Sequence, residues 1–253
     1  MKWNNDIFKR YMEAGLAILI VLTLGLAGAA GVLSPRATER EQNETAAEND
    51  STKASQENEN KTSASNPDTE ETQETIADGQ YPIMGSSNIT VQEMVDYFNA
   101  SGEVYPAEEL SEGGADSIET FCQMYYDEAT AEGVRPEVAF AQTMKETGFL
   151  QYGGDASIEQ FNFAGLGTTG NSVPGNSYPD VQTGIRAQIQ HLKAYATADA
   201  LNQECVDDRY EYVKKGSAPY VQWLGQQENP EGLGWATGDN YGYDIVGMIE
   251  EMM

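Results

Sequence analysis

The segment RPEVAFAQTMKETG, residues 135–148, predicts the most apolar helix of the C-terminal part of the chain. Pro136 suits the first turn of a helix, where its missing N–H would have no partner anyway. Gly148 is the type of residue that ends a helix, and apolar residues between the two recur at helical spacing: Val138, Phe140, Ala141 and Met144. Glu146 lies directly before that end. Since a helix C-terminus and a core both disfavour an anion, Glu146 is either a general acid with a raised pKa or an ordinary solvated glutamate.

Further helices are predicted on both sides of this segment. Each is expected to begin after a residue that can cap a helix: Thr90, Asp116, Asp180 and Asp239. Two of these are followed three residues later by glutamate, which completes a capping box. Residues 153–175 are rich in Gly, Ser, Thr and Asn and predict a long loop, with a short hairpin as an option. The result is a mainly helical domain with one irregular insertion.

The N-terminal 80 residues are unlike the rest of the chain. Residues 14–33 are apolar except for Thr23, and twenty helical residues at about 1.5 Å each span the hydrocarbon core of a bilayer. Basic residues precede this run, so residues 1–13 are expected in the cytoplasm. A retained anchor is favoured over a cleaved signal peptide, although Ala27-Gly28-Ala29 would suit a cleavage site. Residues 34–80 are acidic and nearly free of large apolar residues, which predicts a disordered linker. Residues 81–253 form the exported domain.

The composition excludes several kinds of function. The formal net charge of −27 opposes binding to nucleic acid or to anionic lipid headgroups. One histidine and two cysteines are too few ligands for a zinc finger or an all-cysteine iron–sulfur cluster. Neither GxxxxGK[ST] nor GxGxxG occurs in the sequence. We therefore expect no metal and no organic cofactor, and either hydrolysis by carboxylates and hydroxyls or a binding module.

Four blocks, taken in order, resemble the glucosaminidases of glycoside hydrolase family 73. They are AFAQTMKETGFLQYGG (139–154), EQFNFAGLG (159–167), IRAQIQHLKAY (185–195) and WATGDNYGYDI (235–245). The resemblance extends from about residue 90 to the C-terminus. It implies an α+β, mainly α, lysozyme-like fold and hydrolysis of the β-1,4 bond after N-acetylglucosamine in bacterial peptidoglycan.

The resemblance also assigns roles to individual residues. Glu146 matches the general acid that protonates the leaving-group oxygen, and Tyr241 matches a tyrosine near the −1 sugar. A further segment matches the floor of the cleft: Asn162, Phe163 and Gly165. Trp235 is a candidate sugar-stacking ring, as are Tyr220, Trp223 and Tyr243, although aromatic rings more often fill cores.

The second carboxylate of the family is missing from its expected place. The corresponding segment TTGNSVPGNS, residues 168–177, holds no acid. Asp180 and Glu159 are the nearby options, and Asp180 is equally explained as a helix cap. Without a second carboxylate, the 2-acetamido oxygen of the substrate could attack the anomeric carbon. The hypothesis is substrate assistance, with Glu146 as the acid, Tyr241 holding the acetamido group and Asp180 at most auxiliary.

Three remaining residues have both structural and functional interpretations. His191 is expected to be structural rather than a catalytic base. Cys122 and Cys205 could form a disulfide, which sequence alone does not decide, and a thiol nucleophile paired with His191 is disfavoured.

Together these features predict a single-pass membrane-anchored, monomeric endo-β-N-acetylglucosaminidase facing the cell wall. The alternatives are a muramidase or lytic transglycosylase with the same fold, and a wall-binding module without turnover.

Overall fold

The computed structural model describes residues 79–253, except for residues 88, 155 and 169–172. The predicted cytoplasmic segment 1–13, transmembrane helix 14–33 and nearly all of the linker 34–80 lie outside the described residues. Within the described part, no helix is long and apolar enough to cross a bilayer.

The described residues form a mainly helical domain, as predicted. Its α-helices are α2 (Val91–Ser101), α3 (Ala107–Ser111), α4 (Ile118–Glu132), α5 (Pro136–Thr147), α6 (Val181–Ala196) and α7 (Tyr241–Met252). Short 3-10 helices are η2 (Ile158–Gln160), η3 (Tyr210–Tyr212) and η4 (Val221–Leu224). In the described ranges β-pairing is limited to isolated bridges, such as Met84 with Val134, so an α+β description overstates the β content there. The middle of the predicted loop, 169–172, is not described, and the optional hairpin stays a prediction.

Most of the predicted helix starts are confirmed. Thr90 and Glu93 form the capping box of α2, and Asp180 accepts a hydrogen bond from the Thr183 N–H at 2.7 Å at the start of α6. Two of the expected caps were wrong. Asn240, not Asp239, precedes α7, and it makes no side-chain capping hydrogen bond. Ser117, not Asp116, caps α4 by accepting from the Thr120 N–H. Both residue types cap helices well. Asp116 instead accepts a hydrogen bond from the hydroxyl of Thr120.

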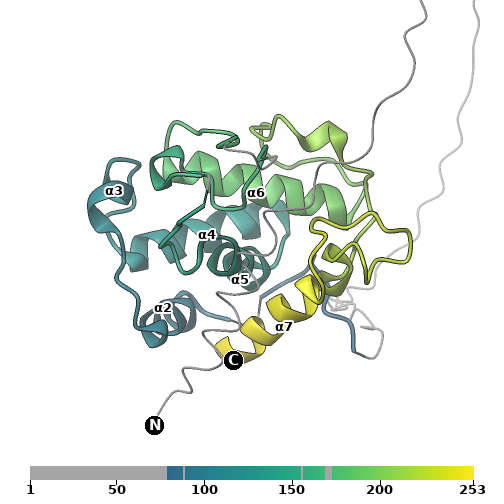
Figure 1. The fold of residues 1–253 in the computed structure, drawn as a ribbon, viewed down its shortest axis with the longest axis horizontal. Helices are drawn as coiled ribbons and strands as arrows, with labels where there is room; N and C mark the ends of the chain where they lie inside the picture. The colour runs from purple at the N-terminus through teal and green to yellow at the C-terminus, as the bar shows by residue number, and fades with distance from the viewer. Residues whose placement is uncertain (1–78, 88, 155, 169–172) are drawn as a thin grey trace, which may run out of the picture. The chain divides into compact units, whose positions relative to one another are not determined.

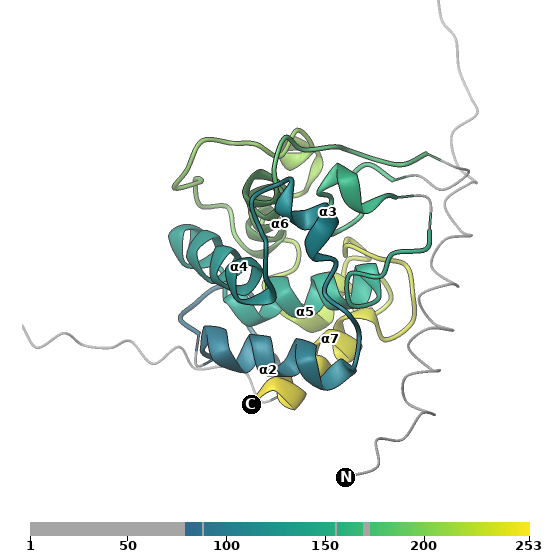
Figure 2. The ribbon, with the colours of Figure 1, turned by 90° about the vertical axis from the view of Figure 1, so that its left-hand side faces the viewer.

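Helix α5 is the central element of the domain. It packs against α4, α6 and α7, whereas α2 packs against α4 and α7 (Figures 1 and 2). Every residue from Pro136 to Met144 is buried, which is the pattern of a helix enclosed on all sides. Aromatic rings from α4, α5 and the following loop pack edge to face in the core: Phe121, Tyr125, Phe140 and Phe163.

Two glycines permit the backbone contacts that hold α6 and α7 in place. A Cβ added to Gly184 would lie 1.8 Å from the carbonyl oxygen of Phe161. A Cβ added to Gly242 would lie 2.1 Å from the carbonyl oxygen of Val221. Gly242 directly follows Tyr241, so this contact with η4 fixes the start of α7 and the position of Tyr241.

Two ion pairs with buried glutamates join α4 to α6. Arg186 forms two hydrogen bonds of 2.8 Å with Glu128, and Lys193 lies 2.8 Å from Glu132. Glu132 also accepts the backbone N–H groups of the segment that follows α6. These acids face a partner helix rather than solvent, which the sequence did not predict.

Candidate active site

The structure brings Glu146 and Tyr241 together. Glu146 is the penultimate residue of α5, and Tyr241 is the first residue of α7. The Tyr241 hydroxyl donates a hydrogen bond to Oε1 of Glu146. Tyr241 is buried, whereas Glu146 is half-buried. The two residues that the sequence analysis placed at the reacting centre are therefore neighbours.

The environment of this pair favours the protonated form of both residues. Burial raises the pKa of Glu146 above its usual range, although the hydrogen bond from Tyr241 and the charge of Lys145 oppose the shift. Burial also raises the pKa of Tyr241 well above its usual range, and the neighbouring Glu146 carboxylate adds to this. Lys145 itself is paired with Asp244 at 2.8 Å. A tyrosine that stays protonated is a permanent donor, and a carboxyl group with a raised pKa suits a general acid.

The backbone on either side of the pair adopts the left-handed conformation. Asn240, just before Tyr241, has a φ of 58°, and three non-glycine residues after Glu146 also have positive φ: Phe149, Leu150 and Tyr152. Each such residue costs on the order of 1–3 kcal/mol, and these conformations concentrate at functional sites. The hydroxyl and carbonyl of Thr147 hold this turn by accepting the N–H groups of Leu150 and Tyr152.

The side chains of the predicted cleft-floor segment bond or pack within the domain. Asn162 donates to the carbonyl of Leu166 at 2.8 Å and accepts the Leu166 N–H at 2.9 Å. The ring of Phe163 is 1% exposed and packs in the core, so it offers no surface to a substrate. Gly165 has a φ of 61°, which suits the tight turn that Asn162 closes.

In the described part of the chain, neither candidate for a second carboxylate, Asp180 or Glu159, is bonded to Glu146. Asp180 caps α6 through its Oδ1 atom, and Glu159 is exposed on η2. Among the described residues, no recorded hydrogen bond links either of them to Glu146.

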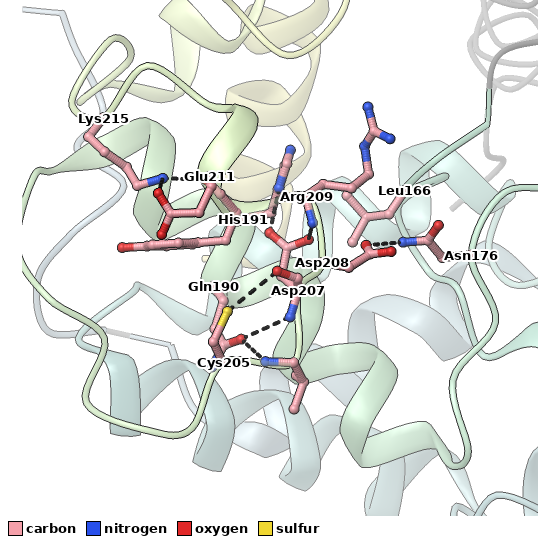
Figure 3. A network of polar contacts seen from close by, with 12 residues as sticks. Leu166, Asn176, Gln190, His191, Cys205, Asp207, Asp208, Arg209, Glu211 and Lys215 are labelled. Atoms are coloured by element: carbon pink, nitrogen blue, oxygen red, sulfur yellow. Dashed lines mark hydrogen bonds and ion pairs between the residues drawn. The ribbon is translucent and has the colours of Figure 1, made fainter. Parts of the chain in front are cut away.

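Trp235 lies beside a histidine–aspartate pair. Nδ1 of His191 is 2.6 Å from Oδ2 of Asp207, and Asp207 also accepts the N–H of Arg209 at 2.9 Å (Figure 3). The Trp235 ring meets His191 edge to face with centroids 4.8 Å apart. His191 is buried between Asp207 and the Trp235 ring, which is consistent with the structural role expected from the sequence.

Both cysteines are free thiols, so the disulfide considered from the sequence is not formed. Cys122 is buried in α4, whereas Cys205 is exposed and donates to the carbonyl of Asp207 at 3.4 Å (Figure 3). Partial desolvation of the sulfur and nearby carboxylates raise the pKa of Cys205, which disfavours a thiolate nucleophile. In the described part of the chain, no group of three or more His, Cys, Asp or Glu residues could hold a metal ion.

Two buried glutamines, Gln142 and Gln188, were missed in the sequence analysis, and they are linked to Tyr241 by hydrogen bonds. Gln142 donates to the Tyr241 hydroxyl at 3.0 Å, and Gln188 donates to Gln142 at 2.9 Å. Both are fully buried. The available signal was a glutamine within the otherwise apolar run of α5, where an unpaired amide would be costly.

A half-buried carboxyl group with a raised pKa, bonded to a protonated tyrosine, has properties that a general acid requires. The chain belongs to the glucosaminidase family: a family model described as mannosyl-glycoprotein endo-beta-N-acetylglucosaminidase matches residues 122–253. The match runs from within α4 to the C-terminus and includes both Glu146 and Tyr241.

An uncharacterized protein of Borreliella burgdorferi is 44% identical over 104 residues, which are 41% of this chain and 51% of that protein. The chain therefore spans about half the length of the curated relative that it matches. No solved structure matches the chain.

Proposed function

We propose that this protein is an endo-β-N-acetylglucosaminidase that hydrolyses the β-1,4 bond after N-acetylglucosamine in bacterial peptidoglycan. The observation that carries the proposal is the contact between Tyr241 and Glu146 within a domain of the glucosaminidase family. The mainly helical architecture is consistent with the lysozyme-like fold that the resemblance implies.

The reaction begins with transfer of a proton from Glu146 to the glycosidic oxygen as the bond from that oxygen to the anomeric carbon breaks. The 2-acetamido oxygen of the same sugar forms a bond to the anomeric carbon. Tyr241 is buried and donates its hydroxyl hydrogen to Glu146, so it positions the acid rather than the acetamido group. Water then attacks the anomeric carbon and displaces the acetamido oxygen, so the bond between that oxygen and the anomeric carbon breaks. The Glu146 carboxylate takes a proton from the attacking water and is an acid again. An inverting enzyme would instead need a second carboxylate roughly 6.5–9.5 Å away. The capping role of Asp180 and the exposure of Glu159 support the substrate-assisted route.

The apolar run at residues 14–33 supports a second part of the proposal, a single-pass anchor with residues 34–80 as a tether. The catalytic domain would then work outside the membrane, in the cell wall, as a monomer on glycan strands.

The test is digestion of purified peptidoglycan by the full chain, followed by borohydride reduction and mass spectrometry of the products. Reduced N-acetylglucosamine at the new end, absent with Glu146→Gln, is the expected result. Glu250→Gln, which changes an exposed glutamate at the far end of α7, is the matched control and should retain turnover.

Other products would overturn parts of the proposal. Reduced muramic acid or a 1,6-anhydro end would show a muramidase or a lytic transglycosylase. Binding to the wall without any product would show a binding module. Asp180→Asn tests the mechanism, because asparagine caps a helix as well as aspartate does. Loss of turnover as complete as in Glu146→Gln, with an intact fold, would refute substrate assistance.

A further inference from the structure

A chain of buried hydrogen bonds that ends at Glu146 begins at the backbone carbonyl of Ala139. The side-chain nitrogen of Gln188 donates to this carbonyl at 3.0 Å and to Oε1 of Gln142 at 2.9 Å. A backbone carbonyl can only accept hydrogen bonds. The nitrogen of the Gln188 amide must therefore face Ala139, which fixes the orientation of this amide.

The other side of the Gln188 amide is equally constrained. Its Oε1 atom lies 2.8 Å from the hydroxyl of Tyr125 and 2.9 Å from that of Thr143, and the two hydroxyls are 2.6 Å apart. Each hydroxyl has one hydrogen, so when one of them donates to the other, the second donates to Oε1 of Gln188. Both N–H groups of the amide are used as well, and Gln188 is fully buried. A reversed amide would place its oxygen against two acceptors.

The orientation of the Gln188 amide also fixes the hydrogen-bond directions at Gln142 and Tyr241. Oε1 of Gln142 is occupied by the Gln188 N–H, so the nitrogen of Gln142 faces Tyr241 and donates to its hydroxyl at 3.0 Å. The Tyr241 oxygen therefore accepts from Gln142, and its single hydrogen is directed to Oε1 of Glu146.

We propose that Gln188 and Gln142 are positioning residues that make Tyr241 a one-way donor to Oε1 of Glu146, so that the transferable proton of Glu146 is held on Oε2. The proposal rests on the proposed role of Glu146 as the general acid. Among the described residues, Oε2 has no recorded hydrogen-bond partner.

The direction of these bonds matters because a protonated carboxyl group next to tyrosine has two arrangements. In one, the carboxyl donates its proton to the tyrosine oxygen, and the proton is not available to a substrate. In the other, the tyrosine donates, and the carboxyl proton lies on the opposite oxygen. Because Gln142 already occupies the acceptor side of Tyr241, the chain selects the second arrangement.

The test uses the full chain and four variants: Gln188→Met, Tyr241→Phe, their combination, and Gln190→Met. Gln190 is the matched control, a buried glutamine two residues away on α6 that bonds the 204–206 segment instead. The titration of Glu146 is followed without substrate by carbon-13 NMR of the glutamate carboxyl groups, assigned through Glu146→Gln. Turnover of peptidoglycan is measured from pH 4 to pH 9.

Gln188→Met should raise the pKa of Glu146 by roughly 0.2–0.6 units, because Tyr241 donates less strongly once its partner is no longer oriented. Since the protonated acid is the active form, the alkaline limb of the pH profile should move upward by the same amount. We expect kcat to fall about 3- to 10-fold at the optimum with KM nearly constant. In the Tyr241→Phe background, Gln188→Met should change neither the titration nor kcat.

An unchanged Glu146 titration in Gln188→Met, or equal shifts with and without Tyr241, would overturn the proposal. A shift of the same size in Gln190→Met would also refute it, since that variant shares only the loss of a buried amide. If Gln188→Met does not fold, Gln142→Met removes the donor to Tyr241 directly and is judged by the same criteria. Absence of turnover in the wild-type chain would refute the proposed function, whereas the NMR titration tests the positioning chain independently.

Discussion

Replacing Glu146 with glutamine should abolish turnover and raise the free energy of unfolding. The pKa of Glu146 is raised by burial, which outweighs the hydrogen bond from Tyr241 and the charge of Lys145. The folded chain therefore binds this proton more tightly than the unfolded chain does. Glutamine keeps an acceptor oxygen for Tyr241 but carries no charge. The substitution therefore removes the unfavourable burial of a charge, and the free energy of unfolding should rise.

The magnitude follows from comparison with Glu250→Gln. Both glutamates lie in the last turn of a helix, and Glu250 is exposed. Removing a negative charge at a helix C-terminus is worth about 0.3–1 kcal/mol in either variant. Glu146→Gln also removes a charge that is partly buried, which Glu250→Gln does not. We therefore expect Glu146→Gln to raise the free energy of unfolding by about 1–2 kcal/mol. For a domain of this size, that corresponds to roughly 2–8 °C in Tm.

The assay is thermal unfolding followed by circular dichroism between pH 4 and pH 8. Below the pKa of an unfolded glutamate, near 4.3, Glu146 is protonated in both the folded and the unfolded wild type. Glu146→Gln should then raise the free energy of unfolding only slightly. The gain should increase as the pH rises toward the folded-state pKa of Glu146 and stay constant above it. A gain at pH 7 no larger than that of Glu250→Gln, or a gain independent of pH, would refute the reasoning.

Three further changes test the packing of the domain. Gly184→Ala would place its Cβ 1.8 Å from a backbone oxygen, and we expect a loss of about 3 kcal/mol in urea unfolding; a loss under 1 kcal/mol would contradict the close approach. Lys193→Met leaves Glu132 buried without its cation and should cost about 3–5 kcal/mol, of which Glu132→Gln in the same chain should restore part. Cys205 is exposed and should react with a maleimide in the folded chain, whereas Cys122 should react only after unfolding; equal labelling in mass spectra would contradict their placement.

The helices were predictable because their signals are local. The capping box of Thr90, the proline at the start of α5 and the cap of α6 each depend on residues within one turn. The cap of α4 was placed one residue early because aspartate and serine are adjacent and both suit the position. Helix α3 was missed altogether, since five residues are too few for a periodic pattern.

The contacts that make the site were not predictable from local patterns. Glu146 and Tyr241 are far apart in the chain, and only the resemblance to a family placed them together. Gln142 and Gln188 appeared as ordinary polar positions because neither carries a local signal of its partner. Pairing across helices depends on how α5, α6 and α7 pack, and that packing depends on close approaches such as the one at Gly242.

The charges of the domain bear on how it could reach its substrate. The described residues hold seven lysines and arginines, and six of these have a carboxylate within 4.0 Å: Arg135, Lys145, Arg186, Lys193, Lys214 and Lys215. The seventh, Arg209, lies over the ring of Tyr212. The described surface therefore has little basic charge left to attract an anionic wall polymer, and its excess of acids would repel one. Attachment by basic patches is thus disfavoured for this domain. This is the physical reason for proposing that retention at the wall depends on the N-terminal segment.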